Sequence, residues 1–413
     1  MSKLEQLIKE HCHDGVAKME IGEFAKAETE KNRDRKCTLA YSITKGGLVP
    51  TSEYFKDTKV TSDDTSGYRI VKKNWFVYSP SRIDVGSINY LREDITVIVS
   101  PLNVVFSVDE SVIIPSYLLY FLNSRSGTWQ ILTSREGIEG TGRKLLPFDK
   151  FSKIKVPVPP IDIQLEIIKI LDSISEYNAT LEKELTARKK QYEYYRDLLL
   201  DFGVHGGRTS ECEWRTLGEI GLVTKLAGFE FTNYVTYSDE GKKIALRGLN
   251  VKNGRLDLTD VKYIDKSDFS KLSRSKLFID DMLFTYVGTI GQVALIDEND
   301  KYYLAPNVAL IRINKDYLLP RFAMYFFQTN SFWSKQIDKL LQSSSMKNIP
   351  MEKIRKFKLP VPPIEEQERI VSILDRFDKL CNDISEGLPA EIEARRKQYE
   401  YYRDKLLSFE ERG

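Results

Sequence analysis

The chain contains the stretch Lys155-Val156-Pro157-Val158-Pro159-Pro160-Ile161, which returns as Lys358-Leu359-Pro360-Val361-Pro362-Pro363-Ile364. The segment RKKQYEYYRD at 188–197 likewise returns as RRKQYEYYRD at 395–404. The second copies lie 203 and 207 residues after the first, about half of the 413-residue chain. That period is too long for a solenoid, whose repeats run roughly 20–50 residues. The sequence therefore indicates two copies of a whole domain with its helix, related by pseudo-twofold symmetry.

A long amphipathic helix is predicted after each Pro-Pro pair, because proline is favoured at a helix start. From Ile167 to Leu199 the seam positions follow a 4-3-4-3 spacing, with two polar interruptions. That spacing is typical of a coiled coil. A continuous helix over 161–200 would be about 60 Å long, at roughly 1.5 Å per residue.

The second helix departs from this pattern near Gly387-Leu388-Pro389, where the four extra residues of the second copy fall. Four residues inserted into a heptad frame form a stutter, and a glycine beside a proline predicts a kink or a stop and restart. The alternative is an amphipathic helix packed only on its own domain. The length of the seam and its duplication favour two helices packed on each other.

The region upstream of each helix has a mixed pattern. Runs of β-branched and aromatic residues predict strands at 69–71, 75–78, 95–99, 243–246, 282–286 and 308–311. Short helices are predicted at 117–122 and 321–327. The halves share landmarks, since Ser100–Val104 corresponds to Ala305–Val308 and Glu20–Phe24 to Thr216–Ile220, but they diverge between them. Similar helices beside divergent halves suggest a shared partner and two different ligands.

The predicted fold class is α+β, with two globular domains in tandem pseudo-twofold repeat, separated by a long antiparallel two-helix coiled coil. The predicted boundaries are 1–150 for the first globular domain, 151–202 for the first helical spacer, 203–353 for the second globular domain and 354–413 for the second helical spacer.

The composition of the chain limits the kinds of ligand and cellular environment that are expected. The net charge of +2 neither supports nor excludes nucleic-acid binding. The four cysteines show no paired spacing, which indicates reduced thiols in a cytoplasm. His11-Cys12-His13 is too crowded for a structural zinc site, so no metal is expected. No signal peptide is recognised, and the longest apolar stretch, 95–106, is too short to span a bilayer.

The chain resembles the specificity subunits of Type I restriction–modification systems over essentially its whole length. The resemblance rests on the duplicated proline segments, the repeated tyrosine-rich block, and Gln164 and Gln367 at matching places in the helices. Gly288-Thr289-Ile290-Gly291 also matches the family's globular domains. The first half departs from the pattern, because its counterpart, Pro80–Ile88, is longer and less regular.

The resemblance implies two target recognition domains, each of which reads half of a bipartite site in double-stranded DNA. It also implies helices that fix the spacer and dock two methyltransferase subunits, with restriction and motor subunits joining that core. It implies no membrane, no cofactor and no catalytic residue. Consistent with this, no G-x-x-x-x-G-K-[ST] phosphate loop and no Asn-Pro-Pro-Tyr-like tetrapeptide occurs in the sequence.

Candidate DNA-contacting residues lie in glycine- or serine-rich loops, where backbone amides can approach a phosphate and cations neutralise it. The predicted residues are Lys45, Arg143, Lys144, Arg247, Asn250, Ser344, Lys347 and Asn348. A solvated turn with incidental charge would look the same. The basic residues at 188–190 and 395–397 are typical of a solvated helix face, or they could lie alongside the spacer DNA.

The repeated aromatic and basic residues are candidates for the methyltransferase contact, because such residues often anchor interfaces, although core packing is as frequent a use. They are Tyr192, Tyr195, Arg196, Tyr399, Tyr402 and Arg403. Two other functions compete with DNA recognition. One is a scaffold that organises two copies of a protein partner without reading DNA, and the other is a fused enzyme, which the missing motifs disfavour.

Overall fold

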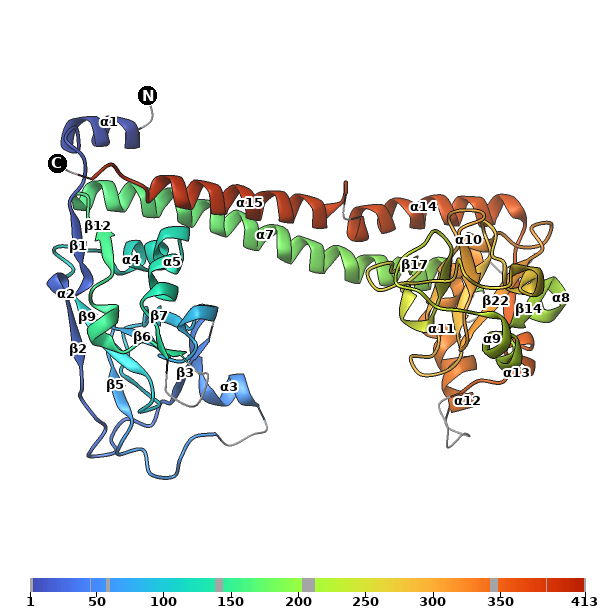
Figure 1. The fold of residues 1–413 in the computed structure, drawn as a ribbon, viewed down its shortest axis with the longest axis horizontal. Coiled ribbons are helices and arrows are strands. Elements are labelled where there is room, and N and C mark those ends of the chain that lie inside the picture. The colour runs from blue at the N-terminus through green and yellow to red at the C-terminus, as the bar shows by residue number, and fades with distance from the viewer. Residues whose placement is uncertain are drawn as a thin grey trace. The chain divides into compact units, whose positions relative to one another are not determined.

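The computed structural model describes residues 3–44, 46–56, 60–137, 144–202, 212–341, 348–383 and 385–411. The chain divides into two compact units. Unit 1 comprises Met1–Leu181 with Ile392–Gly413, and unit 2 comprises Glu182–Glu391. Each unit contains a sheet-based domain together with helical segments from two distant parts of the chain (Figure 1).

The two units are built on sheets of the same topology. In unit 1 the antiparallel sheet has the order β2-β9-β6-β7, and in unit 2 it has the order β14-β22-β19-β20. The strands are β2 (Ala25–Glu28), β9 (Val104–Val108), β6 (Phe76–Tyr78), β7 (Ile88–Tyr90), β14 (Gly221–Lys225), β22 (Val308–Ile313), β19 (Met282–Thr285) and β20 (Val293–Leu295). This shared strand order confirms that the sequence repeat is a duplicated fold.

The predicted strands and short helices are confirmed. The remaining predicted strands are β5 (Arg69–Val71), β8 (Val97–Val99) and β15 (Ile244–Leu246), and the predicted helices are α4 (Pro115–Leu122) and α10 (Pro320–Phe327). Each of these helices begins at a proline, whose fixed φ suits the first helical position. A second helix follows in each half, α5 (Arg125–Thr133) in unit 1 and α11 (Asn330–Phe332) in unit 2.

The repeated proline-rich segment forms a strand that pairs with a strand near the start of each domain. In unit 1 it forms β12 (Lys155–Pro157), which pairs with β1 (Lys18–Glu20) near the start of the half. In unit 2 it forms β23 (Lys358–Val361), which pairs with β13 (Glu213–Thr216). The aliphatic side chains of Val156 and Leu359 are buried in the respective cores. The motif therefore joins the beginning of each domain to the helix that follows it.

The helices have the predicted extents. Helix α7 (Ile161–Leu199) runs without interruption, whereas the second copy is split into α14 (Ile364–Asn382) and α15 (Leu388–Leu406). The break lies at the predicted glycine. A Cβ atom on Gly387 would approach the Lys379 carbonyl oxygen to 2.5 Å, so only glycine fits this close turn.

Within each unit the helical segments pack antiparallel. In unit 1, Arg395 of α15 lies over the ring of Tyr177 of α7, while Tyr402 lines a cavity with the earlier Ile170. In unit 2, the ring of Tyr195 of α7 stacks on Phe377 of α14 with centroids 5.8 Å apart. The predicted α+β class, the tandem repeat and the antiparallel helix packing are thus confirmed. None of the described helices has the length and apolar character needed to cross a bilayer.

Candidate nucleic-acid interface

One edge of the unit 1 sheet gathers several loops. The loop at 79–87 joins β6 to β7, the turn at 100–103 leads into β9, and the hairpin of β3 (Tyr41–Thr44) and β4 (Gly47–Pro50) lies beside them. The backbone N–H of Leu146 donates to the Pro80 carbonyl at 3.0 Å, which fixes β11 (Lys144–Leu145) against the first loop. The edge therefore brings together segments that are far apart in the sequence.

The largely buried guanidinium of Arg135 holds this arrangement in place. It donates to Asp84 at 2.6 Å, to the Ser81 carbonyl at 3.3 Å and to the Lys144 carbonyl at 3.0 Å. One arginine thus connects the end of α5, the loop after β6 and strand β11. A charge-assisted network of this kind makes the loop positions well defined.

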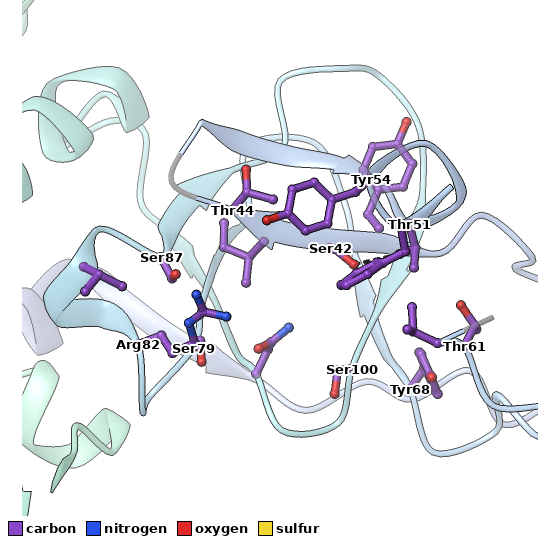
Figure 2. Close-up of a pocket in the computed structure, with 16 residues that line it drawn as sticks. Ser42, Thr44, Thr51, Tyr54, Thr61, Tyr68, Ser79, Arg82, Ser87 and Ser100 are labelled. Carbon is purple, nitrogen blue, oxygen red and sulfur yellow. Dashed lines mark hydrogen bonds between the residues drawn. The ribbon is translucent and has the colours of Figure 1, made fainter. Parts of the chain in front are cut away.

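A polar cavity of about 500 Å³ opens at this edge (Figure 2). Its described lining residues are Tyr41, Ser42, Ile43, Thr44, Thr51, Tyr54, Phe55, Val60, Thr61, Tyr68, Ser79, Arg82, Val85, Ser87, Ser100 and Asn103. Hydroxyl groups and aromatic rings dominate this lining. Arg82 is the one charged side chain among these residues, and none of them is a carboxylate.

Several lining groups already have partners. Ser42 and Thr51 share a hydrogen bond of 2.9 Å, and the Thr44 hydroxyl donates to the Gly47 carbonyl at 2.9 Å. By contrast, the side chains of Arg82 and Asn103 form no hydrogen bond or ion pair with any described residue. A guanidinium and an amide are therefore available to a ligand in this cavity.

The same edge of the unit 2 sheet has a different loop. The 286–292 loop between β19 and β20 is held by Thr285, whose hydroxyl donates to the Thr289 carbonyl and accepts from the Gln292 N–H. Gly288 and Gly291 have φ values of +78° and +83°, which favour glycine. Strand pairing brings Asn348 against Val287, and the Lys225 ammonium lies 5.7 Å from the ring centre of Tyr286. Both halves therefore present loops at one topological position but with different chemistry.

Four of the eight predicted DNA-contacting residues lie in the described part of the chain. Lys45, Arg143, Ser344 and Lys347 lie outside the described residues. Lys144 and Asn348 are exposed, and each lies beside the loop that connects β6 to β7 or β19 to β20. No described carboxylate pairs with Lys144.

Arg247 and Asn250 have internal roles. Asn250 is fully buried, accepts from the Arg247 N–H and donates to the carbonyls of Asp257 and Asp260 at 2.8 and 2.7 Å. Arg247 donates to the Asp260 carboxylate at 2.8 Å. In this conformation Asn250 cannot reach a base edge, so it supports the turn that follows β15.

The structure also reveals site residues that the sequence prediction missed. Arg82 and Asn103 were not predicted as contacts, although both lie in segments that the comparison of the two halves singled out. Arg82 belongs to the irregular counterpart of the Gly288–Gly291 loop, and Asn103 precedes β9 as Asn307 precedes β22. That correspondence was the available signal, but only folding brings these side chains into one cavity.

The repeated helix block has a buried face. Tyr192 and Arg196 are less than a tenth exposed, and the Arg196 guanidinium lies 5.7 Å from the Tyr192 ring centre. Burial raises the pKa of the Tyr192 hydroxyl well above its usual value. In the second copy Arg403 lies over Tyr399 in the same way, at 5.8 Å. These four predicted partner residues therefore pack mainly inside their own unit.

The same block has an exposed face. Tyr194 and Tyr195 form an edge-to-face pair, and Tyr401 and Tyr402 form an equivalent pair, with ring centroids 5.4 and 5.5 Å apart. Tyr194 and Tyr401 are 64% and 61% exposed, which is unusual for large aromatic residues. The sequence prediction included Tyr195 and Tyr402 but missed their more exposed neighbours.

No described group of three His, Cys, Asp or Glu side chains could hold a metal ion. The described part of His11-Cys12-His13 forms ordinary contacts, with His11 near Asp162 and His13 near Asp14.

The chain is similar to known DNA-recognition proteins over most of its length. The family model for the type I restriction modification DNA specificity domain matches residues 13–189 and again 210–394. A type I restriction enzyme specificity subunit of Escherichia coli is 32% identical over 322 residues, covering 75% of this chain and 74% of that protein. A putative type I restriction enzyme specificity subunit of Haemophilus influenzae is 30% identical over 282 residues, covering 66% and 68%.

Solved structures share the fold. A chain from a study of complex assembly and conformational transition in a type I restriction–modification system has a TM-score of 0.66 at 14% identity, and covers 95% of this chain and 97% of its own. The HsdS subunit of Thermoanaerobacter tengcongensis has a TM-score of 0.52 at 15% identity, with coverages of 95% and 96%. At these identities the likeness establishes the fold alone.

Proposed function

Because this chain belongs to the family of type I restriction-modification DNA specificity subunits, we propose that each of its two domains reads one half of a bipartite DNA site. The chain is the DNA-recognition component of such a system and is non-catalytic, since catalysis resides in the methyltransferase and restriction subunits. The observation that supports two half-sites is the pair of equivalent sheets with chemically different loops at the same edge. The scaffold-only alternative has no support in this family.

The DNA interface in this proposal is the loop-bearing edge of each sheet. Lys144 and Asn348 would approach the DNA from equivalent positions, because each belongs to a described segment that bonds to the β6–β7 or β19–β20 loop. Lys45, Arg143, Ser344 and Lys347 remain proposed contacts, and Arg247 is a weaker one because Asp260 already pairs with it. Contacts to the DNA phosphates fix the register of the protein on the duplex, whereas contacts to base edges provide sequence specificity.

The helices would set the distance between the half-sites. In this proposal the recognition domains are 1–150 and 203–353, and the helical spacers are 151–202 and 354–413. A helix rises roughly 1.5 Å per residue, so the lengths of α7 and of α14 with α15 translate into base pairs of spacer. A protein that reads chromosomal DNA in this way would act in the cytoplasm.

Two methyltransferase subunits would dock on the two exposed tyrosine pairs, Tyr194–Tyr195 and Tyr401–Tyr402. Exposed aromatic residues are frequent anchors of protein interfaces, and the equivalence of the pairs implies two equivalent partners. The buried members of the block, such as Tyr192 and Arg196, would hold these pairs in position. Restriction and motor subunits would then join through the methyltransferases.

The decisive experiment is to assemble the chain with its methyltransferase and map the methylated adenines in genomic DNA. The expected result is one bipartite motif with a fixed spacer. Methylation without sequence preference would contradict the proposal, and duplex binding that does not weaken with salt would contradict the phosphate contacts.

A further inference from the structure

The polar cavity of unit 1 has the chemistry of a base-reading site. We propose that Arg82 and Asn103 are specificity-determining residues of the first recognition domain, and that Arg82 contacts the edge of a guanine in its half-site. This inference rests on the proposed function and assigns it to particular side chains. Arginine suits guanine because its planar fork can donate to both N7 and O6, and asparagine suits adenine by a similar two-bond pairing.

The side chains of Arg82 and Asn103 lie in one cavity and have no described bonding partner. Arg82 lies in the loop after β6 and Asn103 precedes β9, yet both line one cavity of about 500 Å³. Neither side chain bonds to any described residue. The neighbouring Asp84 does not neutralise Arg82, because the Asp84 carboxylate is already paired with Arg135 at 2.6 Å. An incoming group therefore meets a guanidinium whose donors no described residue occupies.

A base edge and a phosphate require different groups around them. A phosphate presents only acceptors, so its sites are rich in donors and cations. Among the described lining residues the one cation, Arg82, shares the cavity with the Asn103 amide, which can both donate and accept. The Ser79, Ser87 and Ser100 hydroxyls, which also donate and accept, line the same cavity (Figure 2). Base edges present donors and acceptors together. The mixed lining therefore matches a base edge better than the backbone.

The backbone segments that carry Arg82 and Asn103 are held in place by local structure. Arg82 directly precedes a short 3₁₀ helix, Ile83–Val85, which is followed by Gly86 in the left-handed region with a φ of 85°. The Asn103 N–H donates to the Ser100 carbonyl at 3.0 Å, which fixes the turn before β9. A site whose supporting shell is already bonded loses little conformational entropy when it binds.

Unit 2 provides an internal comparison. Its corresponding loop contains Gly288-Thr289-Ile290-Gly291 and no cation, although Asn307 occupies the place of Asn103 at the strand entrance. Asn307 is exposed and has a left-handed φ of 69°, unlike the nearly buried Asn103. A change at Arg82 should therefore alter the sequence preference of the first half-site and leave that of the second half-site unchanged.

The test is to map methylated sites for complexes that contain the wild-type chain, R82A, R82K or N103A. Lys9→Ala is the control, because Lys9 is exposed on α1 (Lys3–His11), lies outside the cavity and carries the same charge. R82A should reduce the preference for guanine at one position of the first half-site by roughly 5- to 150-fold. N103A should relax a different position of the same half-site.

R82K separates the two kinds of contact. Lysine keeps the charge but lacks the planar fork, so a base-reading role predicts a weaker guanine preference than that of the wild type, whereas a phosphate contact predicts an unchanged motif. An unchanged motif in R82A, with a salt dependence of log affinity lowered by about one unit, would instead assign Arg82 to a phosphate and overturn the proposal.

Other outcomes are also informative. An unchanged motif with unchanged affinity would show that the cavity faces away from DNA, which also overturns it. Because Arg82 is exposed and unbonded, both variants should assemble like the wild type, which gel filtration of the complexes would verify. A wild-type complex without a bipartite motif would contradict the proposed function itself, and this is distinct from failure at Arg82.

Discussion

The side-chain amide of Gln164 is fully buried and accepts a hydrogen bond from the backbone N–H of Ile114 at 2.9 Å. It also donates to the carbonyls of Val112 and Pro159 at 2.9 and 2.8 Å. Gln367 repeats this arrangement with the Leu319 N–H and the carbonyls of Tyr317 and Pro362. The glutamine at each helix start thus joins the helix to the segment that enters α4 or α10.

Replacing Gln164 with leucine should lower the free energy of unfolding of unit 1 by about 2–5 kcal/mol, because three buried backbone groups lose their partners. Urea denaturation followed by circular dichroism would measure it. Leu165→Ala is a suitable control, since Leu165 is 54% exposed on the same helix. Equal loss in both variants would contradict the structural role of the amide.

Replacing Tyr194 and Tyr195 together with alanine should remove one of two bound methyltransferase subunits, and replacing Tyr401 and Tyr402 should remove the other. The reason is that each exposed pair is proposed to anchor one partner. Native mass spectrometry at saturating partner would count the subunits. A wild-type complex with only one methyltransferase, or full occupancy in both double variants, would refute this assignment.

Replacing Arg143 and Lys144 with alanine should weaken DNA binding, as should replacing Lys347. Each lost phosphate contact should flatten the dependence of log affinity on log salt concentration by about one unit. Binding isotherms at several salt concentrations would test this. Affinity and slope equal to those of the wild type would identify these cations as parts of an ordinary surface turn.

Deleting four residues from the Ser385–Pro389 region should shorten the spacer between the half-sites by one or two base pairs. The deletion removes about 6 Å of helix, and duplex DNA rises about 3.4 Å per base pair. Methylation mapping should find both half-site sequences unchanged. An active variant with the wild-type spacer would end the idea that helix length sets the spacing.

Alkaline pH should destabilise the protein through its buried tyrosines. Burial raises the pKa of Tyr78, Tyr117 and Tyr325 well above the usual value, with the hydrogen bond from Tyr325 to Asp375 adding to the effect. Their stabilisation is fully present below the unfolded-state pKa of about 10 and is lost as the pH rises above it, at about 1.4 kcal/mol per pH unit for each phenol.

Tyr78→Phe should therefore reduce the slope of unfolding free energy against pH above about pH 10. At neutral pH it should cost about 1 kcal/mol, because Tyr78 donates to the Leu146 carbonyl at 3.0 Å. Tyr54→Phe, at a 56% exposed phenol, is the control. Equilibrium denaturation across the pH range would show the difference, and identical slopes for the two variants would contradict it.

The repeat, the helices and most strands could be predicted from the sequence. The heptad spacing after Ile161, the prolines at 115 and 320 and the glycine at 387 act through neighbours in the chain, so they could be interpreted locally. The sequence comparison of the halves also matched the segments that contain Arg82 and Asn103. It could not indicate which side chains lack a described bonding partner in the fold. Asp84, for example, pairs with Arg135, which lies 51 residues away, and therefore does not neutralise Arg82.

Long-range packing, in contrast, sets which face of each repeated block is buried and what that face contacts. Asp197 accepts a hydrogen bond from the Asn330 N–H in unit 2, and its repeat partner Asp404 accepts one from the Arg125 N–H in unit 1. Each block therefore helps to position the domain of the opposite copy. Helical periodicity defines an apolar face but not the surface that covers it, because that surface is assembled from residues 133 and 279 positions away along the chain.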